Sequence, residues 1–156
     1  MRLHICAVGR LKTGPERTMV DDYLTRFDKT GRQLSLGPAR VTEVEDRKGG
    51  GMSAEAALLS RAVPDGALTC IMDERGRRMP SPDFAQQLAT WRDQGRQDVA
   101  FLIGGADGLD SSLRESADFA LSFGDMVWPH MLVRVMLAEQ LYRAASILAG
   151  TPYHRA

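Results

Sequence analysis

The stretch VAFLIGGADG, residues 99–108, decides the fold of this chain. Its first five residues form a continuous apolar run, which is the pattern of a β-strand buried on both faces of a sheet. Gly104 and Gly105 follow the run directly, and a short helix is expected from Ser111 to Ala117. A buried strand, a glycine-rich turn and a helix in this order predict an α/β domain, in which helices flank a mainly parallel sheet.

The same alternation of strand-like and helix-like segments continues over the whole chain. Strands are expected at residues 3–8, 39–44, 67–72, 99–103 and 119–122. Further helices are expected at residues 15–27, 53–62 and 131–149, and between Ser81 and Gly95. Ser53 and Ser81 are the expected N-caps, and Gly150 is expected to end the last helix. No internal repeat or linker divides the sequence, so residues 1–156 are predicted to form one domain.

The composition is that of an ordinary globular protein of 156 residues, with 44% hydrophobic and 26% charged residues. No apolar run approaches the ~18–20 residues of a membrane-spanning helix, and the first nine residues are interpreted as a strand rather than a signal peptide. Cys6 and Cys70 lie inside apolar runs and are interpreted as buried, reduced thiols. His4, His130 and His154 lack metal-ligand spacing. We therefore expect a cytoplasmic protein that binds no metal and no membrane.

The balance of charges bears on whether the chain binds nucleic acid. Lysines and arginines number 20, and so do aspartates and glutamates, so the formal net charge is zero. Nucleic-acid-binding proteins usually carry a basic surplus, and this balance counts against such a role. Basic residues are nevertheless concentrated at 75–78, at 47–48 and in the C-terminal tail. A neutral chain could bind RNA through a large folded surface, or through basic edges that two subunits bring together.

Three familiar kinds of site are poorly supported by the glycine-rich turn at residues 104–108. The phosphate-binding pattern G-x-x-x-x-G-K-[ST] is absent. Asp125 lies about 20 residues beyond the glycines, where a dinucleotide-binding fold has its ribose-binding acid, but too few strands follow it. No serine stands in a G-x-S-x-G turn. Asp107 and Asp110 are better interpreted as turn and N-cap residues than as a pair of hydrolytic acids.

Three irregular segments follow three predicted strands and are candidates for one ligand pocket. They are Asp73–Gly76, Gly104–Gly108 and Phe123–His130. The last segment combines large apolar side chains with glycine and proline, which suits a loop around an apolar, partly aromatic ligand. If their strands are neighbours in the sheet, the three segments should face one crevice.

At these segments the sequence resembles the SPOUT-class methyltransferases, and within them the ribosomal RNA large-subunit methyltransferase H family. The resemblance spans essentially the whole chain and is most specific toward the C-terminus. The matching segments are Leu3–Gly9, Met72-Asp73-Glu74 with Gly76, Phe101–Gly105 with Gly108-Leu109, Pro129-His130, Leu132–Val135, Glu139–Ala144 and Pro152–Arg155. The departures from the family pattern are small: Met131 stands at a variable position, and Gln97 looks like a single inserted residue.

The resemblance implies an α/β-knot fold with a C-terminal trefoil knot, a homodimer and the cofactor S-adenosylmethionine. The activity it implies is methylation at N3 of a pseudouridine in large-subunit (23S) ribosomal RNA, pseudouridine 1915 in the usual rRNA numbering. By position, the residues that would contact the cofactor are Met72, Gly104, Phe123, Gly124, Asp125, Met126, Val127 and Trp128. Backbone groups of such loops can bind adenine while apolar side chains enclose it.

Methylation at this nitrogen requires loss of the imide proton. His154 is our candidate for the general base, because imidazole titrates near neutral pH. Tyr153 and Arg155 would position the target base and a phosphate, and the tail could reach the pocket of the other subunit. Arg134 and Arg143 lie on different faces of the last helix, and either could contact phosphate or the dimer partner. Because the chain is electrically neutral, an assembled ribosomal particle is the expected substrate in preference to free rRNA.

Two other classes of function stay open at this point. The chain could be a non-catalytic RNA-binding or ribosome-assembly factor, which would bind no S-adenosylmethionine. It could instead be a nicotinamide-dependent enzyme, which competition between the two cofactors would reveal.

Overall fold

The computed structural model describes residues 1–155, in which five strands alternate with helices. The strands are β1 (Arg2–Val8), β2 (Ala39–Val44), β3 (Leu68–Arg78), β4 (Asp98–Ile103) and β5 (Phe119–Ser122). The helices are α1 (Pro15–Gly31), the short 3₁₀-helix η1 (Arg32–Leu34), α2 (Gly51–Ala62), α3 (Ser81–Asp93), α4 (Ser111–Ser116) and α5 (His130–Ala149). Every strand and α-helix expected from the sequence is present, although several boundaries differ.

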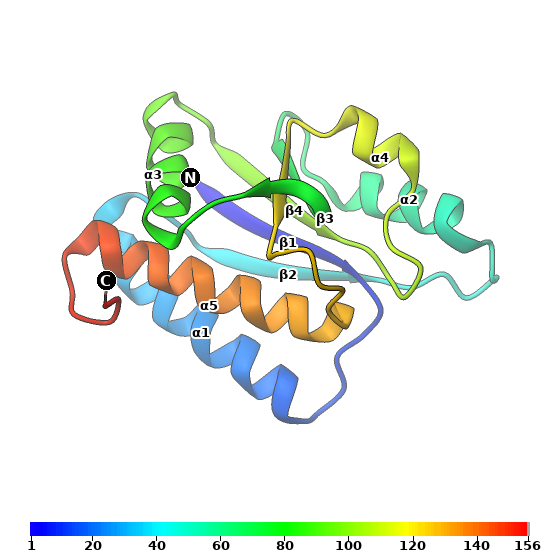
Figure 1. Cartoon of the computed structure of the whole chain (residues 1–156), viewed down its shortest axis with the longest axis horizontal. Helices are drawn as coiled ribbons and strands as arrows, with labels where there is room; N and C mark the ends of the chain where they lie inside the picture. The colour runs from blue at the N-terminus through cyan, green and yellow to red at the C-terminus, as the bar shows by residue number, and fades with distance from the viewer. Residues whose placement is uncertain (156) are drawn as a thin grey trace.

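All five strands are parallel and form one sheet in the order β2-β1-β4-β3-β5. Successive side chains of a strand point to opposite faces of the sheet. β1 therefore directs Leu3 and Ile5 into one apolar cluster and Cys6 into another. Helices α1, α3 and α5 cover the first face, and α2 and α4 cover the second (Figure 1). The sequence-based expectation of an α/β domain with a parallel sheet is confirmed.

Helix α5 is the longest helix and packs against α1 and α3. Leu137 and Leu141 are fully buried in its contact with the rest of the core. The helix ends before Gly150, whose φ of 73° is a left-handed conformation that glycine adopts without strain. The 20 residues of α5 span about 30 Å, so its two ends lie in different parts of the molecule.

The start of α2 differs from the expectation. The helix begins at Gly51, so Ser53 lies inside it and is not its N-cap. The carboxylate of Asp46 instead orders the preceding turn, where it accepts hydrogen bonds from the backbone N–H groups of Lys48 and Gly50 at 3.1 and 2.6 Å. This turn delivers the chain directly into the helix.

Other helix boundaries are shifted by smaller amounts. The N-cap of α3 is Pro80, one residue before the expected Ser81. The hydroxyl of Ser81 donates to Oε1 of Gln140 on α5 at 2.7 Å, so it joins two helices rather than capping one. α5 begins at His130, and α1 continues to Gly31.

Strand β3 continues past Met72 as far as Arg78, although residues 73–76 were expected to form a loop. Residues 73–76 bulge out of the pairing with β5, since Met72 and Arg77 are both in register with Leu121. A Cβ at Gly76 would lie 2.7 Å from the carbonyl carbon of Ala120, so the two backbones approach too closely for any side chain. The expected loop is therefore an irregularity inside the strand.

Cys6 and Cys70 are buried free thiols, as expected. Burial raises the pKa of the Cys6 thiol to about 11 and also raises the pKa of Cys70. Within residues 1–155, no helix is long and apolar enough to cross a membrane.

Candidate active site

A cavity of about 660 Å³ lies beyond the carboxyl ends of β4 and β5 and beside residues 72–75 in the middle of β3. These strands are neighbours in the sheet, so the irregular segments meet at one edge. The cavity is lined by residues 72–75, 103–109, 123–124 and 126–130, together with Val133. Its size is ordinary for a small-molecule or cofactor site. The expectation that the three irregular segments face one crevice is confirmed.

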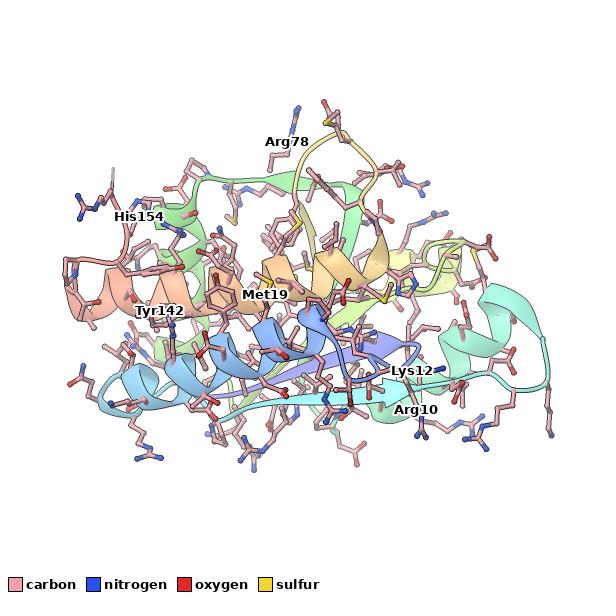
Figure 2. All side chains as sticks on the ribbon, turned by 90° about the horizontal axis from the view of Figure 1, so that it is seen from below. Arg10, Lys12, Met19, Arg78, Tyr142 and His154 are labelled. Carbon is pink, nitrogen blue, oxygen red and sulfur yellow. The ribbon has the colours of Figure 1, made fainter. Side chains whose placement is uncertain are left out.

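Most of the residues expected to contact a cofactor are brought together here. Those that line the cavity are Met72, Gly104, Phe123, Gly124, Met126, Val127 and Trp128. Asp125 is the exception, because its exposed carboxylate pairs with the guanidinium of Arg78 at 3.0 Å. This ion pair joins the loop after β5 to the end of β3, and Figure 2 shows Arg78 beside that loop.

The turn after β4 is built from close backbone contacts. A Cβ at Gly104 would lie 2.6 Å from the carbonyl oxygen of Gly108, which no side chain tolerates. The turn is closed by a hydrogen bond from the N–H of Gly108 to the carbonyl of Gly105 at 3.0 Å. Without side chains on these glycines, backbone donors and acceptors can reach a ligand directly.

Charge in the cavity is predominantly negative. Asp73, Glu74 and Asp107 line it, and only Arg75 supplies a positive charge from the lining, paired with Asp73 at 3.2 Å. Beside the glycine turn, burial and the negative charge of Asp107 raise the pKa of Glu55. A surplus of carboxylates favours a cationic ligand and disfavours the diphosphate of a dinucleotide.

The first turns of α5 form another wall of the cavity through His130 and Val133. Burial, and then the positive charge of Arg134, lower the pKa of His130, so its imidazole is neutral at pH 7. Arg134 is fully buried, and its Nη1 donates to Oε2 of Glu43 at 2.7 Å. The expectation that Arg134 could contact phosphate or a dimer partner was wrong, because its charge is paired inside the subunit.

The C-terminal tail lies beside the other half of α5. Nδ1 of His154 is 3.1 Å from Nη1 of Arg143, and the hydroxyl of Tyr153 donates to Oε1 of Glu139 at 2.9 Å. Burial, and then the hydrogen bond with Glu139, raise the pKa of Tyr153, so its phenol stays protonated. Tyr153, His154 and Arg155 do not line the cavity of their own subunit in the part of the chain that the structure describes. Figure 2 shows His154 beside the C-terminal part of α5.

The contact between His154 and Arg143 defines the state of the tail imidazole. A guanidinium can only donate a hydrogen bond, so Nδ1 of His154 accepts it and a neutral ring carries its proton on Nε2. The docked imidazole is therefore a hydrogen-bond donor toward solvent. The site expected from the sequence divides in two, since most residues expected to contact the cofactor assemble, whereas the residues expected to be catalytic do not join them within one subunit.

His130 belongs to the segment Phe123–His130 that was expected to face the pocket, and it does line the cavity. The residues expected to contact the cofactor nevertheless end at Trp128, so no role was predicted for His130. Its position directly after Pro129, between a strand-end loop and the start of a long helix, was the available signal. No group of three or more His, Cys, Asp or Glu side chains within residues 1–155 is arranged to hold a metal ion.

Comparisons with known proteins extend over the whole chain. The family described as "Predicted SPOUT methyltransferase" matches residues 1–154. The chain is 71% identical over 155 residues to the ribosomal RNA large subunit methyltransferase H of Ruegeria pomeroyi, and 74% identical over 155 residues to the protein of the same name from Roseobacter denitrificans. Each comparison covers 99% of both sequences.

Two solved structures share the fold at low identity. A probable methyltransferase from Bordetella pertussis superimposes with a TM-score of 0.54 at 16% identity, over 92% of this chain and 96% of that one. A probable methylase family protein from Haemophilus influenzae gives a TM-score of 0.52 at 11% identity, over 99% of this chain and 70% of that one. Together with the family match, these findings establish that the chain is a methyltransferase that belongs to the SPOUT family.

Proposed function

We propose that the chain uses S-adenosylmethionine to methylate N3 of a pseudouridine in large-subunit ribosomal RNA, pseudouridine 1915 in the usual rRNA numbering. The names of the two relatives support this class of RNA. The observation that carries the proposal is the cavity beside β3, β4 and β5, which gathers residues expected to bind the cofactor.

The lining of the cavity fits this cofactor. Met72, Phe123 and Trp128 offer apolar surface for adenine, and Gly104 contributes backbone to the same lining. The surplus of carboxylates suits a ligand that carries a positive charge. When bound, the sulfonium of S-adenosylmethionine supplies an activated methyl group, so the protein has to orient the target nitrogen and remove its proton.

Removal of the imide proton is assigned to the C-terminal tail. His154 is proposed as the base, and Tyr153 and Arg155 as the groups that position the target base and a phosphate. In the docked tail, Nδ1 of His154 is occupied by Arg143. The imidazole must leave Arg143 before Nδ1 can accept the imide proton, so the proposal requires the tail to move.

The proposal includes a homodimer in which the tail of one subunit serves the cavity of the other. About 20 Å of helix separates His130, at the cavity, from Arg143, beside the tail. A tail that docks at Arg143 is therefore remote from its own cavity. A second subunit packed against the start of α5 could place its tail there.

Exposed apolar side chains at the cavity mouth support such packing. Met126 and Val127 expose 74% and 82% of their surface, and Trp128, Met131 and Leu132 are also exposed. Large apolar side chains gathered at one surface mark interaction sites, and a second copy would cover these. Light scattering of the purified protein should give twice the mass of one chain, whereas the substitution Val127→Glu should shift the mass to that of a monomer.

Three further parts of the proposal follow from the family. They are the trefoil knot of the C-terminal segment, an assembled ribosomal particle as substrate and a cytoplasmic location. The zero net charge supports the second part, because affinity for naked RNA depends mainly on neutralising its phosphates with a basic surplus.

The decisive experiment maps the methyl group on the RNA. The purified protein is incubated with isotopically labelled S-adenosylmethionine and with ribosomes, large subunits or free rRNA. The RNA is then cleaved, and the masses of its fragments are measured by mass spectrometry. We expect one added methyl group on one pseudouridine of ribosomal particles. Equal turnover on free rRNA would contradict the particle as substrate. Failure of calorimetry to detect cofactor binding would instead favour an assembly factor.

A further inference from the structure

His130 has a polar atom without a partner in the wall of the cavity. Its Nδ1 is buried and makes no hydrogen bond. The ring lies against Gly9 at the end of β1, where a Cβ would be 3.7 Å from Cε1 of His130. Buried polar atoms in native proteins almost always have a partner, so this nitrogen requires an explanation.

A matching atom lies one helical turn further along α5. The terminal nitrogens of Arg134 are occupied, since Nη1 donates to Glu43 and Nη2 donates to the carbonyl oxygens of Val8 and Gly9 at 3.3 and 3.2 Å. Its Nε is also buried but has no partner. Residues four apart on a helix are neighbours on the same face, so the two unpaired nitrogens belong to adjacent side chains.

The two nitrogens are complementary. Nε of a guanidinium always carries a proton and can only donate, whereas one ring nitrogen of a neutral imidazole accepts. We propose that one water bridges the two atoms, accepting from Nε–H of Arg134 and donating to Nδ1 of His130, so that the imidazole proton lies on Nε2. His130 then presents a neutral N–H donor to the cofactor cavity.

This role deepens the proposed function and rests on it. S-adenosylmethionine carries a positive sulfonium together with oxygen acceptors on its ribose and its carboxylate. A neutral donor can bind one of these oxygens without repelling the sulfonium, which a protonated imidazole would do. His130 is thus a cofactor-contacting residue, and Arg134 is a positioning residue that acts through it. Glu43 balances the charge of Arg134 at 2.7 Å.

The tautomer can be tested on the protein without ligand. The chain contains three histidines, so single substitutions of His4 and His154 assign the ¹⁵N ring resonances of His130. We expect the wild-type ring to carry its proton on Nε2. Arg134→Met should abolish this preference, and the control Glu43→Gln should keep it. A wild-type His130 with its proton on Nδ1 would overturn the proposal.

The contact with the cofactor is tested by two isosteric substitutions and calorimetry with S-adenosylmethionine. His130→Gln places an amide nitrogen near the position of Nε2, and His130→Asn places one near Nδ1. The Gln variant should bind within about threefold of the wild type, and the Asn variant about tenfold more weakly, which is the value of one hydrogen bond. Equal affinity of all three proteins would overturn the contact. Absence of binding by the wild type would overturn the proposed function, while the tautomer measurement would still decide the pairing with Arg134.

Discussion

The two ends of α5 each place a histidine near an arginine, yet they differ in how the arginine is held. Toward the N-terminal end, Arg134 is fully buried, and His130 lines the cavity. Toward the C-terminal end, Arg143 leaves 25% of its side chain exposed and contacts His154 of the tail. The first arrangement is part of the folded core, whereas the second is a contact at the surface of the subunit.

The difference shows how one helix can serve two tasks. Two backbone carbonyls and Glu43 fix Arg134 when the subunit folds, so the cavity wall is formed before any ligand arrives. Arg143 shares Glu139 with the hydroxyl of Tyr153, so partly exposed groups hold the tail. A buried contact at the cavity and a surface contact at the tail fit the proposed site, in which the tail of one subunit moves to the cavity of the other.

The largest expected effect comes from removing the tail imidazole. His154→Ala should lower methyl transfer by about 100-fold or more, the usual contribution of a general base, and should leave the affinity for S-adenosylmethionine near that of the wild type. Turnover on ribosomes and calorimetry measure the two quantities. Unchanged turnover would remove His154 from the mechanism.

Mixing subunits tests whether the tail acts on the partner. A variant that lacks His154 and a variant with a closed cavity should each be inactive, and a mixed dimer should regain one working site. If mixing restores no activity, the two ends of α5 do not cooperate between subunits.

The next largest effect is on stability, and it should differ between substitutions of Arg134 and Arg143. Arg134→Met should lower the free energy of unfolding by about 3 kcal/mol or more, because it removes the cation paired with Glu43 and the donor to the carbonyl oxygens of Val8 and Gly9. Arg143→Met should cost less than about 1 kcal/mol, as is usual for a partly exposed ion pair. Urea denaturation of both variants gives the comparison, and similar losses would contradict the distinction between a core and a surface contact.

A smaller effect is expected from the turn that forms the cavity floor. Gly104→Ala would push a methyl group to 2.6 Å from the carbonyl oxygen of Gly108, and the resulting overpacking should cost about 1–3 kcal/mol and weaken cofactor binding. Gly14→Ala is the matched control, because the nearest atom to its added Cβ lies at 3.7 Å. Calorimetry and thermal denaturation of both variants test the prediction. Loss of binding in the control alone would refute it.

The smallest effect is a dependence of stability on pH. Because the pKa of His130 lies below its usual 6.5, the unfolded chain binds a proton more readily than the native one. The contribution of His130 to stability is therefore complete above pH 6.5 and declines as the pH falls below it. Arg134 of α5 is the charged group that lowers the pKa of His130. The other charged groups that face the same cavity are Asp73, Glu74 and Arg75 of β3 and Asp107 after β4, and Glu43 of β2 pairs with Arg134.

Denaturation at several pH values compares the wild type with His130→Gln, which cannot titrate. The variant should lose less stability between pH 6.5 and 5 than the wild type. If the free energy of unfolding depended on pH identically in the two proteins, burial of His130 would not contribute to that dependence.

Much of the fold was predictable, because each strand carries a local signal. The apolar run Val99–Ile103 and the glycines behind it identified a buried strand and its turn. The bulge in β3 was not predictable, since it depends on how closely Gly76 approaches β5. Neither was the burial of Arg134, because an arginine on a helix normally indicates an exposed face, and only its pairing with Glu43 of a distant strand reverses that.

The cavity was predicted from one rule: segments that follow neighbouring parallel strands meet at one edge of the sheet. The sequence contained the segments but not the strand order, so their adjacency became known only from the sheet. Asp125 matched the family by position, but its carboxylate turns to Arg78 instead of the cavity. A position in a motif predicts where the backbone lies better than where a side chain points.

The sheet order has a consequence for solubility. A single open sheet has two edges, and each edge offers unpaired backbone groups to which a strand of another chain could add. β5 limits this risk by its length of only four residues. β2 is longer and carries charges instead, with Arg40 near its start and Glu43 near its end. Replacing Arg40 and Thr42 with valine would leave the subunit folded but expose a flat apolar edge, and the protein would then be prone to aggregate through β2.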